Sequence, residues 1–596
     1  MMMMKKISGL NQILLFLVVI SPALILSKLV IENSVNVPFW DQWEVAAFVS
    51  NFYSGKLSFG DFLAQQNESR LLFPRLLFVA LAGLTNWDVR YEVLAILTLA
   101  YATSYNIYRL SAFTFPSNNR QHLWLTFLAN LLIFSTIQWG NWIWGIQLIV
   151  FVPILCVTTC LSVACSRLNP IAKFTICVAF STISTFSYAN GVLCWIITLP
   201  MLAVSTFQPV VNISPLRLIT GRKWLLLGWI FCFTSNVILY FHDYKKPEAH
   251  PSFVEALIHP VLAVRYFCSF LGAPLGFGDL LAGQIIGAIL LVLFGLAVLF
   301  LLQHLHDREL LHRMLVWLSV GAYAIISGLI TTAGRVGFGL EQSLSARYTT
   351  FSIYLAISLI FLVAIILNEV GRTTSLRSEN KIKPRYIAAS LILILVVLHA
   401  LSSAHGVRFL IITQRNFLQG KACVSFVNVV YEEKCLNDVY PIPEVVKNRA
   451  SVLNDLGFLK PPLVSSREIQ PLSRGNRKDS NKQPYGTFDS LTQTGSNEYI
   501  ASGWATLPNR KSIADAVVLT YEAPNGNSII FAISDKREFR ADVVKFLGDS
   551  RYEKAGWQKS FPRDRLPEGA HKISAWAFDS TVGEAFQLDG VHNFQE

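Results

Sequence analysis

The feature that most constrains this chain is a series of apolar runs, each long enough to cross a lipid bilayer. A helix needs about 20 predominantly apolar residues to span the hydrocarbon core. Of the 596 residues, 53% are hydrophobic and only 15% are charged, so lipid must be the main solvent. The runs lie near residues 10–31, 91–110, 121–137, 147–166, 171–187, 190–207, 224–241, 283–303, 314–331, 346–367 and 386–404. They predict a polytopic α-helical membrane protein with about 11 spans.

The distribution of Lys and Arg predicts which side of the membrane each loop faces. The first run follows two lysines and has no small-x-small cleavage site, so it is interpreted as a signal anchor with a cytoplasmic N-terminus. Loops of that side are rich in Lys and Arg, including 368–385, whereas the connections 138–146 and 187–190 have none. An odd number of spans then places everything after residue 404 outside the cytoplasm.

The formal net charge of +12 is distributed over these loops and does not form a basic domain, which excludes nucleic acid as a partner. The chain contains no P-loop, no dinucleotide-binding glycine pattern and no nucleophile elbow. Seven of the nine cysteines lie in or beside apolar runs and are interpreted as core residues, without the spacing of a metal site. His242, His250 and His259 share one outer loop at non-ligand spacing, and we expect them on the surface.

The segment after residue 404 changes character twice. A helical stretch and linker occupy 405–485, and 486–596 contains short β-branched and aromatic runs between turn residues, which predicts a β-sandwich domain. The predicted domains are therefore a membrane domain (1–404) with a large first outer loop (32–90), the linker segment and the sandwich. Trp504, Trp557 and Trp576 of the sandwich either line a sugar-binding face or belong to the core. Cys423 and Cys435 either form a disulfide or stay free thiols.

Two carboxylates of the first outer loop are the main candidates for chemistry. Asp41 lies between Trp40 and Trp43, which would remove water from the carboxylate, raise its basicity and suit it to deprotonate a hydroxyl nucleophile. Glu68 lies in a second polar stretch that ends at Arg70. The alternative is an interfacial aromatic belt that contains an incidental acid.

Further polar residues lie at the predicted outer ends of the spans. They include Gln138, Trp142 and Asn190, and the segment 334–350 adds Arg335, Gln342 and Arg347. Polar groups at membrane depth are costly unless they face a cavity, so we expect a shared cavity that opens outward. The guanidinium groups of Arg335 and Arg347 suit a lipid phosphate. Both could instead extend to lipid headgroups.

These residues resemble the GT-C superfamily of polytopic membrane glycosyltransferases, and more narrowly a bacterial envelope group. The resemblance covers roughly residues 10–404 and is carried by Trp40-Asp41-Gln42-Trp43, Gln66-Asn67-Glu68-Ser69-Arg70, Tyr188-Ala189-Asn190-Gly191 and Ser345-Ala346-Arg347-Tyr348-Thr349. It implies that Asp41 and Glu68 are catalytic. It also implies substrate binding by Glu44, Gln66, Asn67, Arg70, Gln138, Trp142, Asn190, Arg335, Gln342 and Arg347. The group has histidines where this chain has Gln66 and Ser69, so no metal ligand is predicted. No cofactor is assigned, and whether the protein needs a divalent metal is left open.

The resemblance implies an inverting glycosyltransferase that moves a sugar from a polyprenyl-phosphate-linked donor to an envelope glycan or lipid acceptor. The reaction would take place on the outer face of a bacterial inner (plasma) membrane, with membrane lipid as a further partner and the C-terminal domain extracytoplasmic. One alternative is an exporter or flippase of lipid-linked glycan, which predicts inverted repeats that the sequence does not show. Another is a membrane-anchored glycan-binding protein.

Overall fold

A computed structural model describes residues 9–116, 119–206, 223–374, 384–474, 484–495, 497–534 and 536–593. Contacts in space divide the chain into two compact units. The first, here the helical unit, comprises Met1–Ser34, Ser58–Leu77 and Glu92–Ile411; the second, here the tail unit, comprises Val35–Leu57, Phe78–Tyr91 and Ile412–Glu596. The predicted division into 1–404, 405–485 and 486–596 follows the chain instead and stays a prediction.

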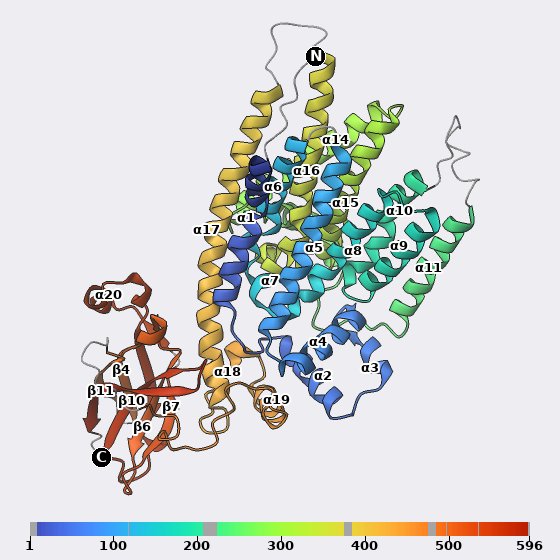
Figure 1. Cartoon of the computed structure of the whole chain (residues 1–596). Helices are drawn as coiled ribbons and strands as arrows, with labels where there is room; N and C mark the ends of the chain where they lie inside the picture. Colours follow the sequence, from blue (N-terminus) through green and yellow to red (C-terminus); the bar gives the residue numbers. More distant parts are fainter. Residues whose placement is uncertain are drawn as a thin grey trace. The chain divides into compact units, whose positions relative to one another are not determined.

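All eleven apolar runs of the sequence coincide with helices (Figure 1). These are α1 (Gly9–Asn33), α5 (Arg90–Thr114), α6 (Asn119–Ile133), α8 (Leu148–Ala164), α9 (Pro170–Thr185), α10 (Leu193–Thr206), α11 (Lys223–Phe241), α14 (Leu280–Gln303), α15 (Arg308–Arg335), α16 (Ala346–Thr374) and α17 (Pro384–Ser425). Within the described residues, eight helices are long and apolar enough to cross a membrane. Of the other predicted spans, α9 and α10 are shorter and α5 is more polar. The predicted polytopic α-helical membrane fold is confirmed.

Small residues let the helices of the helical unit approach closely. Helix α13 (Pro260–Gly272) packs on α14, where a Cβ added to Gly272 would lie 2.0 Å from the carbonyl oxygen of Gly283. A Cβ added to Gly406 of α17 would lie 2.1 Å from the carbonyl oxygen of Thr136. Close backbone contact of this kind replaces the hydrophobic effect as a driving force between helices in lipid.

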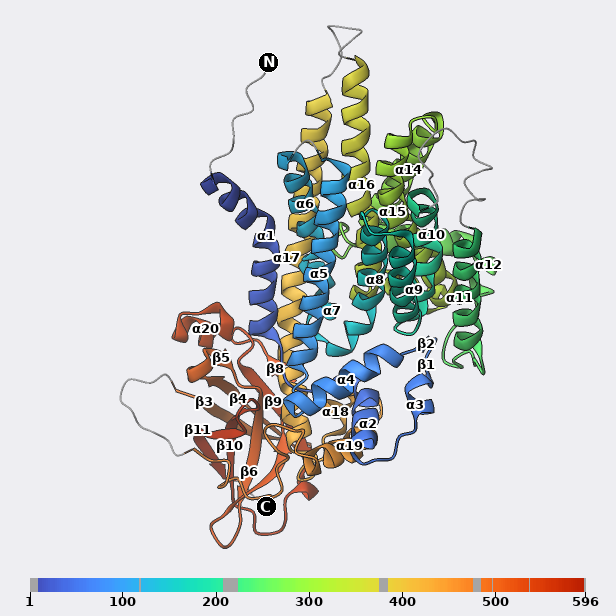
Figure 2. The same cartoon turned by 45° about the vertical axis from the view of Figure 1, so that its right-hand side comes forward.

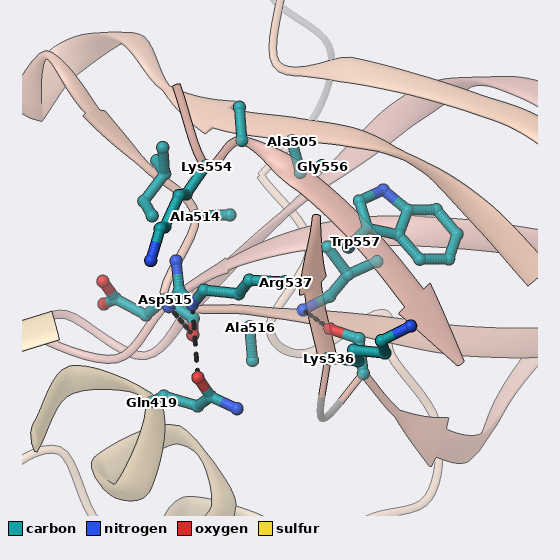
Figure 3. Close-up of a pocket in the computed structure, with 14 residues that line it drawn as sticks. Gln419, Ala505, Ala514, Asp515, Ala516, Lys536, Arg537, Lys554, Gly556 and Trp557 are labelled. Carbon is teal, nitrogen blue, oxygen red and sulfur yellow. Dashed lines mark hydrogen bonds between the residues drawn. The ribbon is translucent and has the colours of Figure 1, made fainter. Parts of the chain in front are cut away.

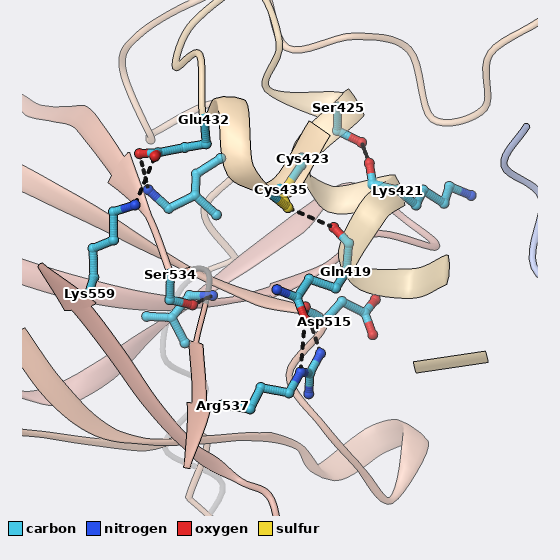
Figure 4. Close-up of a disulfide and its surroundings, with 12 residues drawn as sticks. Gln419, Lys421, Cys423, Ser425, Glu432, Cys435, Asp515, Ser534, Arg537 and Lys559 are labelled. Atoms are coloured by element: carbon cyan, nitrogen blue, oxygen red, sulfur yellow. Dashed lines mark hydrogen bonds and ion pairs between the residues drawn. A yellow bond between two sulfur atoms is a disulfide. The ribbon is translucent and has the colours of Figure 1, made fainter. Parts of the chain in front are cut away.

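The helical stretch predicted after residue 404 is continuous with the last span, because α17 runs without a break to Ser425. Gly406, a residue that weakens isolated helices, is tolerated there because it allows the contact with Thr136. Two shorter helices follow, α18 (Glu433–Val439) and α19 (Pro443–Asp455). Of the two possibilities for Cys423 and Cys435, the structure contains the disulfide, which joins the end of α17 to α18 (Figure 4).

The strands of the tail unit form one curled nine-stranded sheet in the order β7-β6-β10-β11-β3-β4-β9-β8, with β5 paired to β4. The strands are β3 (Gly486–Thr494), β4 (Glu498–Leu507), β5 (Ser512–Ile513), β6 (Ala516–Glu522), β7 (Ser528–Ile533), β8 (Lys536–Glu538), β9 (Gly556–Pro562), β10 (Lys572–Asp579) and β11 (Glu584–Asn593). All neighbours are antiparallel except β11 and β3. Residues of β6 and β10 share one core with residues of β4 and β9, so the sheet encloses its core as a sandwich does. Figure 2 shows the strands from a second side.

The three tryptophans of this sheet are core residues. Trp504 is 7%, Trp557 3% and Trp576 7% exposed, and each belongs to a cluster of buried apolar side chains. A ring that stacks on a sugar must present a face to solvent. The hypothesis that these tryptophans line a sugar-binding face is therefore not supported.

The outer face of β6, β7, β10 and β11 is also apolar, and residues outside 486–596 cover it. Its members, Ala516, Val518, Ile530, Ile533, Trp576, Phe578 and Ala585, pack against Ala422, Phe426, Val429, Val430, Val464 and Ile469. The sheet alone would expose this patch to water.

We therefore expect residues 486–596 produced alone to aggregate, whereas residues 412–596 are monodisperse and β-rich. Size-exclusion chromatography and circular dichroism of both fragments check this. A monodisperse 486–596 fragment with a cooperative unfolding transition would show that the covering segment is dispensable.

Candidate functional site

A short hairpin in the helical unit presents Glu68. Strands β1 (Gln65–Gln66) and β2 (Ser69–Arg70) pair, and Asn67 in the turn has φ 50°, a left-handed conformation that asparagine tolerates. The Gln65 side-chain amide donates to the carbonyl oxygens of Asn67 and Lys245, at 2.6 and 2.5 Å. The turn is thereby fixed to the loop after α11, beside which Figure 2 shows it. Gln66 and Asn67, both predicted site residues, shape this hairpin.

Arg70 and Ser69 attach the same hairpin to the ends of three helical segments. The guanidinium of Arg70 donates to the carbonyl oxygens of Tyr240 and Leu63, both at 2.7 Å, and to that of His242. The Ser69 hydroxyl accepts from the backbone N–H of Ala189 at 3.1 Å. Arg70, predicted to bind substrate, is thus engaged with backbone carbonyls and positions the hairpin.

The Glu68 carboxylate joins three segments that are far apart in the sequence. Arg335 Nη2, at the end of α15, donates to Oε2 at 2.9 Å, and His250 Nδ1 contacts Oε1. The side chains of Glu68, Arg335 and His250 are only 24%, 19% and 18% exposed. The Tyr240 hydroxyl donates to the Glu68 carbonyl oxygen. A guanidinium, an imidazole and a carboxylate therefore meet in a half-buried cluster, here the Glu68 cluster.

Two donors at this cluster have no hydrogen-bond partner among the described residues. They are Arg335 Nη1 and the hydroxyl of Tyr266, which interacts electrostatically with Arg335, and both are buried. A buried donor without a partner costs about 1–3 kcal/mol. Such groups at the end of α15 and on the neighbouring α13 are typical of a site that accepts an oxygen-rich ligand.

Two tyrosines outside the spans respond to the charge of the Glu68 cluster. Burial raises the pKa of Tyr188, and Arg347, Arg335 and Glu68 are among the charged groups close enough to act on it. Burial and then the Glu68 charge raise the pKa of Tyr244. Both phenols stay protonated at neutral pH and can donate hydrogen bonds.

Of the other predicted residues of the segment 334–350, Gln342 lies in the 3-10 helix Leu340–Leu344 and Arg347 in the first turn of α16. Gln342 Nε2 lies 3.5 Å from the Tyr348 hydroxyl, and the Arg347 guanidinium lies 5.6 Å from the centre of the Trp144 ring. A ring face attracts a guanidinium without occupying its donors, so Arg347 can still bind an anion. Asn190 is 4% exposed in the short 3-10 helix Ala189–Val192, next to Tyr188.

Gln138 and Trp142 have structural partners. The Gln138 amide donates to the Ile133 carbonyl at 3.0 Å and accepts from the Thr350 hydroxyl at 2.6 Å, and it is 1% exposed. Trp142 is fully buried, and its Nε1 donates to the Ser135 carbonyl at 2.9 Å. The structure places both inside the bundle, where they connect helices, and their predicted contact with substrate stays a prediction.

Asp41 and Glu44 belong to the tail unit, at the start of α2 (Gln42–Tyr53). Asp41 is half-buried, Trp43 is fully buried and Trp40 is 42% exposed. Trp40 has φ 45°, which costs a bulky residue about 1–2 kcal/mol and is observed most often at functional sites. A carboxylate at a helix N-terminus also stabilises the helix through its interaction with the helix dipole, so Asp41 has a structural role as well.

Glu44 already has two partners in the tail unit. It accepts from the Arg449 guanidinium at 2.8 Å and from the Tyr440 hydroxyl at 2.7 Å. Burial raises the pKa of Glu44, but the hydrogen bonds from Arg449 and Tyr440 outweigh it and hold the pKa below its usual value. The predicted substrate contact of Glu44 would have to compete with this ion pair.

Sequence reasoning missed His250 and Tyr266. The prediction that His250 lies on the surface is wrong, because its imidazole contacts Glu68 and is 18% exposed. A histidine in a mixed loop has no sequence signature of such a contact. Among the described residues, no group of three or more His, Cys, Asp and Glu side chains could hold a metal ion.

No family model and no curated protein matches the chain. Solved structures of the oligosaccharyltransferase AglB from Archaeoglobus fulgidus are similar to it. The complex with an inhibitory peptide and a dolichol-phosphate is 14% identical, with 67% of this chain and 56% of that chain covered and a TM-score of 0.39. The apo form is 13% identical, with 81% and 62% covered and a TM-score of 0.40. The chain spans less than two thirds of the length of these proteins.

Proposed function

We propose that the protein is a glycosyltransferase that uses a polyprenyl-phosphate-linked sugar. The observation that carries the proposal is the Glu68 cluster, in which Arg335 is held by Glu68 through one terminal nitrogen while its other terminal nitrogen, Nη1, has no acceptor among the described residues. A guanidinium that is fixed through one nitrogen and has a buried second nitrogen without an acceptor is suited to a phosphate oxygen. Arg347 and the Tyr266 hydroxyl supply further donors.

In the proposed reaction, the bond between the sugar C1 and the phosphate oxygen breaks, and its electron pair stays on the phosphate. Positive charge develops on the sugar ring and negative charge on the leaving phosphate. Arg335 and Arg347 stabilise the phosphate charge, and fixed donors of this kind lower the barrier because they need no reorganisation. The acceptor hydroxyl attacks C1 from the opposite face and inverts the configuration.

Asp41 is the proposed base that takes the proton of the acceptor hydroxyl. Glu68 has a different part, because its carboxylate is already bound by Arg335 and His250. It orients the guanidinium toward the donor phosphate. In this proposal Asp41 acts on the acceptor and Glu68 acts, through Arg335, on the donor.

The reaction is placed on the outer face of a bacterial inner membrane, with an envelope glycan or lipid as acceptor. The disulfide between Cys423 and Cys435 supports this side, because disulfides persist in oxidising compartments. We expect alkaline phosphatase to be active when it is fused after residue 420 and inactive when it is fused after residue 385. The reason is that alkaline phosphatase folds only outside the cytoplasm. The reverse pattern would contradict the proposed orientation.

Mass spectrometry of envelope glycans from a deletion strain tests the function itself. We expect one sugar to be missing. A complete glycan that accumulates on its lipid carrier would instead identify an exporter.

A further inference from the structure

The loop between α11 and α14 contains a helical stretch whose exposed side is apolar. Helix α12 (Glu255–Ile258) leads into α13, and six large apolar side chains along this stretch are between 52% and 81% exposed. They are Phe253, Val254, Leu257, Ile258, Val261 and Val264. An exposed apolar surface of this kind is typical of a contact with another protein or with lipid.

The packing of α13 on α14 favours lipid. Helix α14 is long and apolar enough to cross a membrane. A Cβ added to Gly287 would lie 1.8 Å from the Cys268 carbonyl oxygen, and one added to Gly272 would lie 2.0 Å from that of Gly283. The two helices are therefore antiparallel and in backbone contact along residues 283–287, so α13 lies at the depth of the first turns of a membrane span. Acyl chains are the molecules that cover an apolar surface at that depth.

Arg265 is a charged residue in this apolar surface. It is exposed on α13, on the same side as Val261 and Val264. Its Nε donates to Oε1 of Gln284 in α14 at 3.4 Å. Among the described residues, the Arg265 guanidinium has no further hydrogen bond and no ion pair. Gln284 Nε2 is buried and has no hydrogen-bond partner in the same part of the chain. The pair therefore lacks an acceptor oxygen.

The acids that flank Arg265 in the sequence have other partners. Glu255 Oε2 lies 3.8 Å from His259 Nε2, and Asp279 Oδ1 accepts from the backbone N–H of Ala282 at 2.8 Å. An arginine at membrane depth is costly unless it is paired. Carboxylates and phosphates are the acceptors that fit its fork. Because no described carboxylate pairs with Arg265, the acceptor that the membrane itself offers is a lipid phosphate.

The tail unit contains the same pair of side chains in a completed form. At the pocket in Figure 3, Arg537 Nε donates to Gln419 Oε1 at 3.2 Å. Arg537 Nη2 also donates to the Asp515 carbonyl oxygen at 3.0 Å. The protein thus supplies a second acceptor for Arg537, whereas the described part of the chain supplies none for Arg265.

We propose that Arg265 binds the phosphate group of a membrane phospholipid, whose acyl chains cover the apolar side of α12 and α13. Gln284 positions the guanidinium through Nε, which leaves both terminal nitrogens for phosphate oxygens. The next residue, Tyr266, is buried and interacts electrostatically with Arg335. The bound lipid therefore supports the helix that supplies a donor to the Glu68 cluster. The lipid site itself does not depend on the proposed function.

Lipid binding to the purified full-length chain in detergent tests the phosphate site. Native mass spectrometry counts the bound phosphatidylglycerol molecules. We expect Arg265→Met to need about 10-fold more phosphatidylglycerol than the wild type for the same number of bound molecules, as for loss of a charge-assisted hydrogen bond. Arg265→Lys should fall between the two, since lysine keeps the charge and loses the fork. Arg408→Met, which removes an exposed arginine of α17, is the matched control and should bind as the wild type does.

The unfolding temperature supplies a second readout, with diacylglycerol, which lacks the phosphate, and inorganic phosphate as further probes. Phosphatidylglycerol should raise the unfolding temperature of the wild type more than that of Arg265→Met, because a ligand stabilises the state that it binds. If Arg265→Met fails to fold, Gln284→Leu should still weaken lipid binding severalfold. Equal binding by the wild type and the variants, or equal stabilisation by diacylglycerol, would overturn the phosphate site. Equal stabilisation by inorganic phosphate would overturn the assignment to a lipid.

Cysteine labelling in membrane fragments, where a reagent reaches both sides, tests the acyl-chain cover. Leu257 is 81% exposed, and Glu248 of the same loop is exposed as well. Above the wild-type background from the native cysteines, a membrane-impermeant maleimide should label Glu248→Cys at once and Leu257→Cys only after detergent is added. Equal labelling of both without detergent would show that water covers α12 and would overturn the lipid contact. None of these results bears on whether the chain transfers sugar.

Discussion

Arg335→Ala is expected to reduce sugar transfer by about 100-fold or more, as does the removal of one fixed donor from a developing anion. The substitution removes the nitrogen that holds Glu68 and the buried nitrogen that has no acceptor among the described residues and is proposed to bind the donor phosphate. Arg335→Lys should recover part of the activity, since lysine keeps the charge and loses the fork. Initial rates with a polyprenyl-phosphate-linked sugar, measured over a range of donor concentrations, check this.

The partner variant Glu68→Gln distinguishes phosphate binding from a structural ion pair. If Arg335 binds the donor, Arg335→Ala should still cause a large further loss in the Glu68→Gln background. If Arg335 serves only to hold Glu68, the two losses should coincide. Coinciding losses would contradict the proposed part of Arg335.

Glu432→Ala is expected to destabilise the tail unit by about 3–5 kcal/mol, the cost of breaking a buried ion pair by removal of one partner. Glu432 is 7% exposed and accepts from Lys559 Nζ of β9 at 2.7 Å (Figure 4). It also accepts from Arg565 at 2.6 Å. It ties the segment after α17 to the sheet. Denaturant unfolding of the 412–596 fragment, and limited proteolysis of the full chain, measure the effect.

The neighbouring Glu433 is exposed and supplies the control, because Glu433→Ala should change stability by less than about 0.5 kcal/mol. The double variant Glu432→Leu with Lys559→Met should recover much of the loss, since apolar residues of similar size often replace a buried ion pair at little cost. A loss of less than 1 kcal/mol in Glu432→Ala, by the same assay, would show that the pair does not hold the segment in place.

The sequence predicted the helices of the membrane part because the signal there is local. Any run of about 20 apolar residues must satisfy its backbone within itself, which makes it a helix. The sequence also indicated a helical stretch after residue 404, but not the long-range contact that α17 makes there between Gly406 and Thr136. The cover of the sheet by Phe426 and Val430 is likewise a long-range contact without a local pattern.

For the candidate site, the sequence identified Glu68 and Arg335 because charged groups at the ends of spans are unusual. The structure pairs these two. His250 escaped prediction because it lies in a loop of mixed composition, where a histidine has no distinguishing spacing. The engagement of Arg70 with backbone carbonyls could not be predicted either, because those acceptors come from other segments.

The most direct test of the account compares a deletion strain that carries the wild-type gene with one that carries Asp41→Asn. The amide has nearly the shape of the carboxylate but cannot take a proton from the acceptor hydroxyl. With equal amounts of protein in the membrane, mass spectrometry should show the complete envelope glycan in the first strain and a glycan that lacks one sugar in the second. A complete glycan in the Asp41→Asn strain would contradict the assignment of Asp41, and a complete glycan in the uncomplemented deletion strain would contradict sugar transfer by this protein.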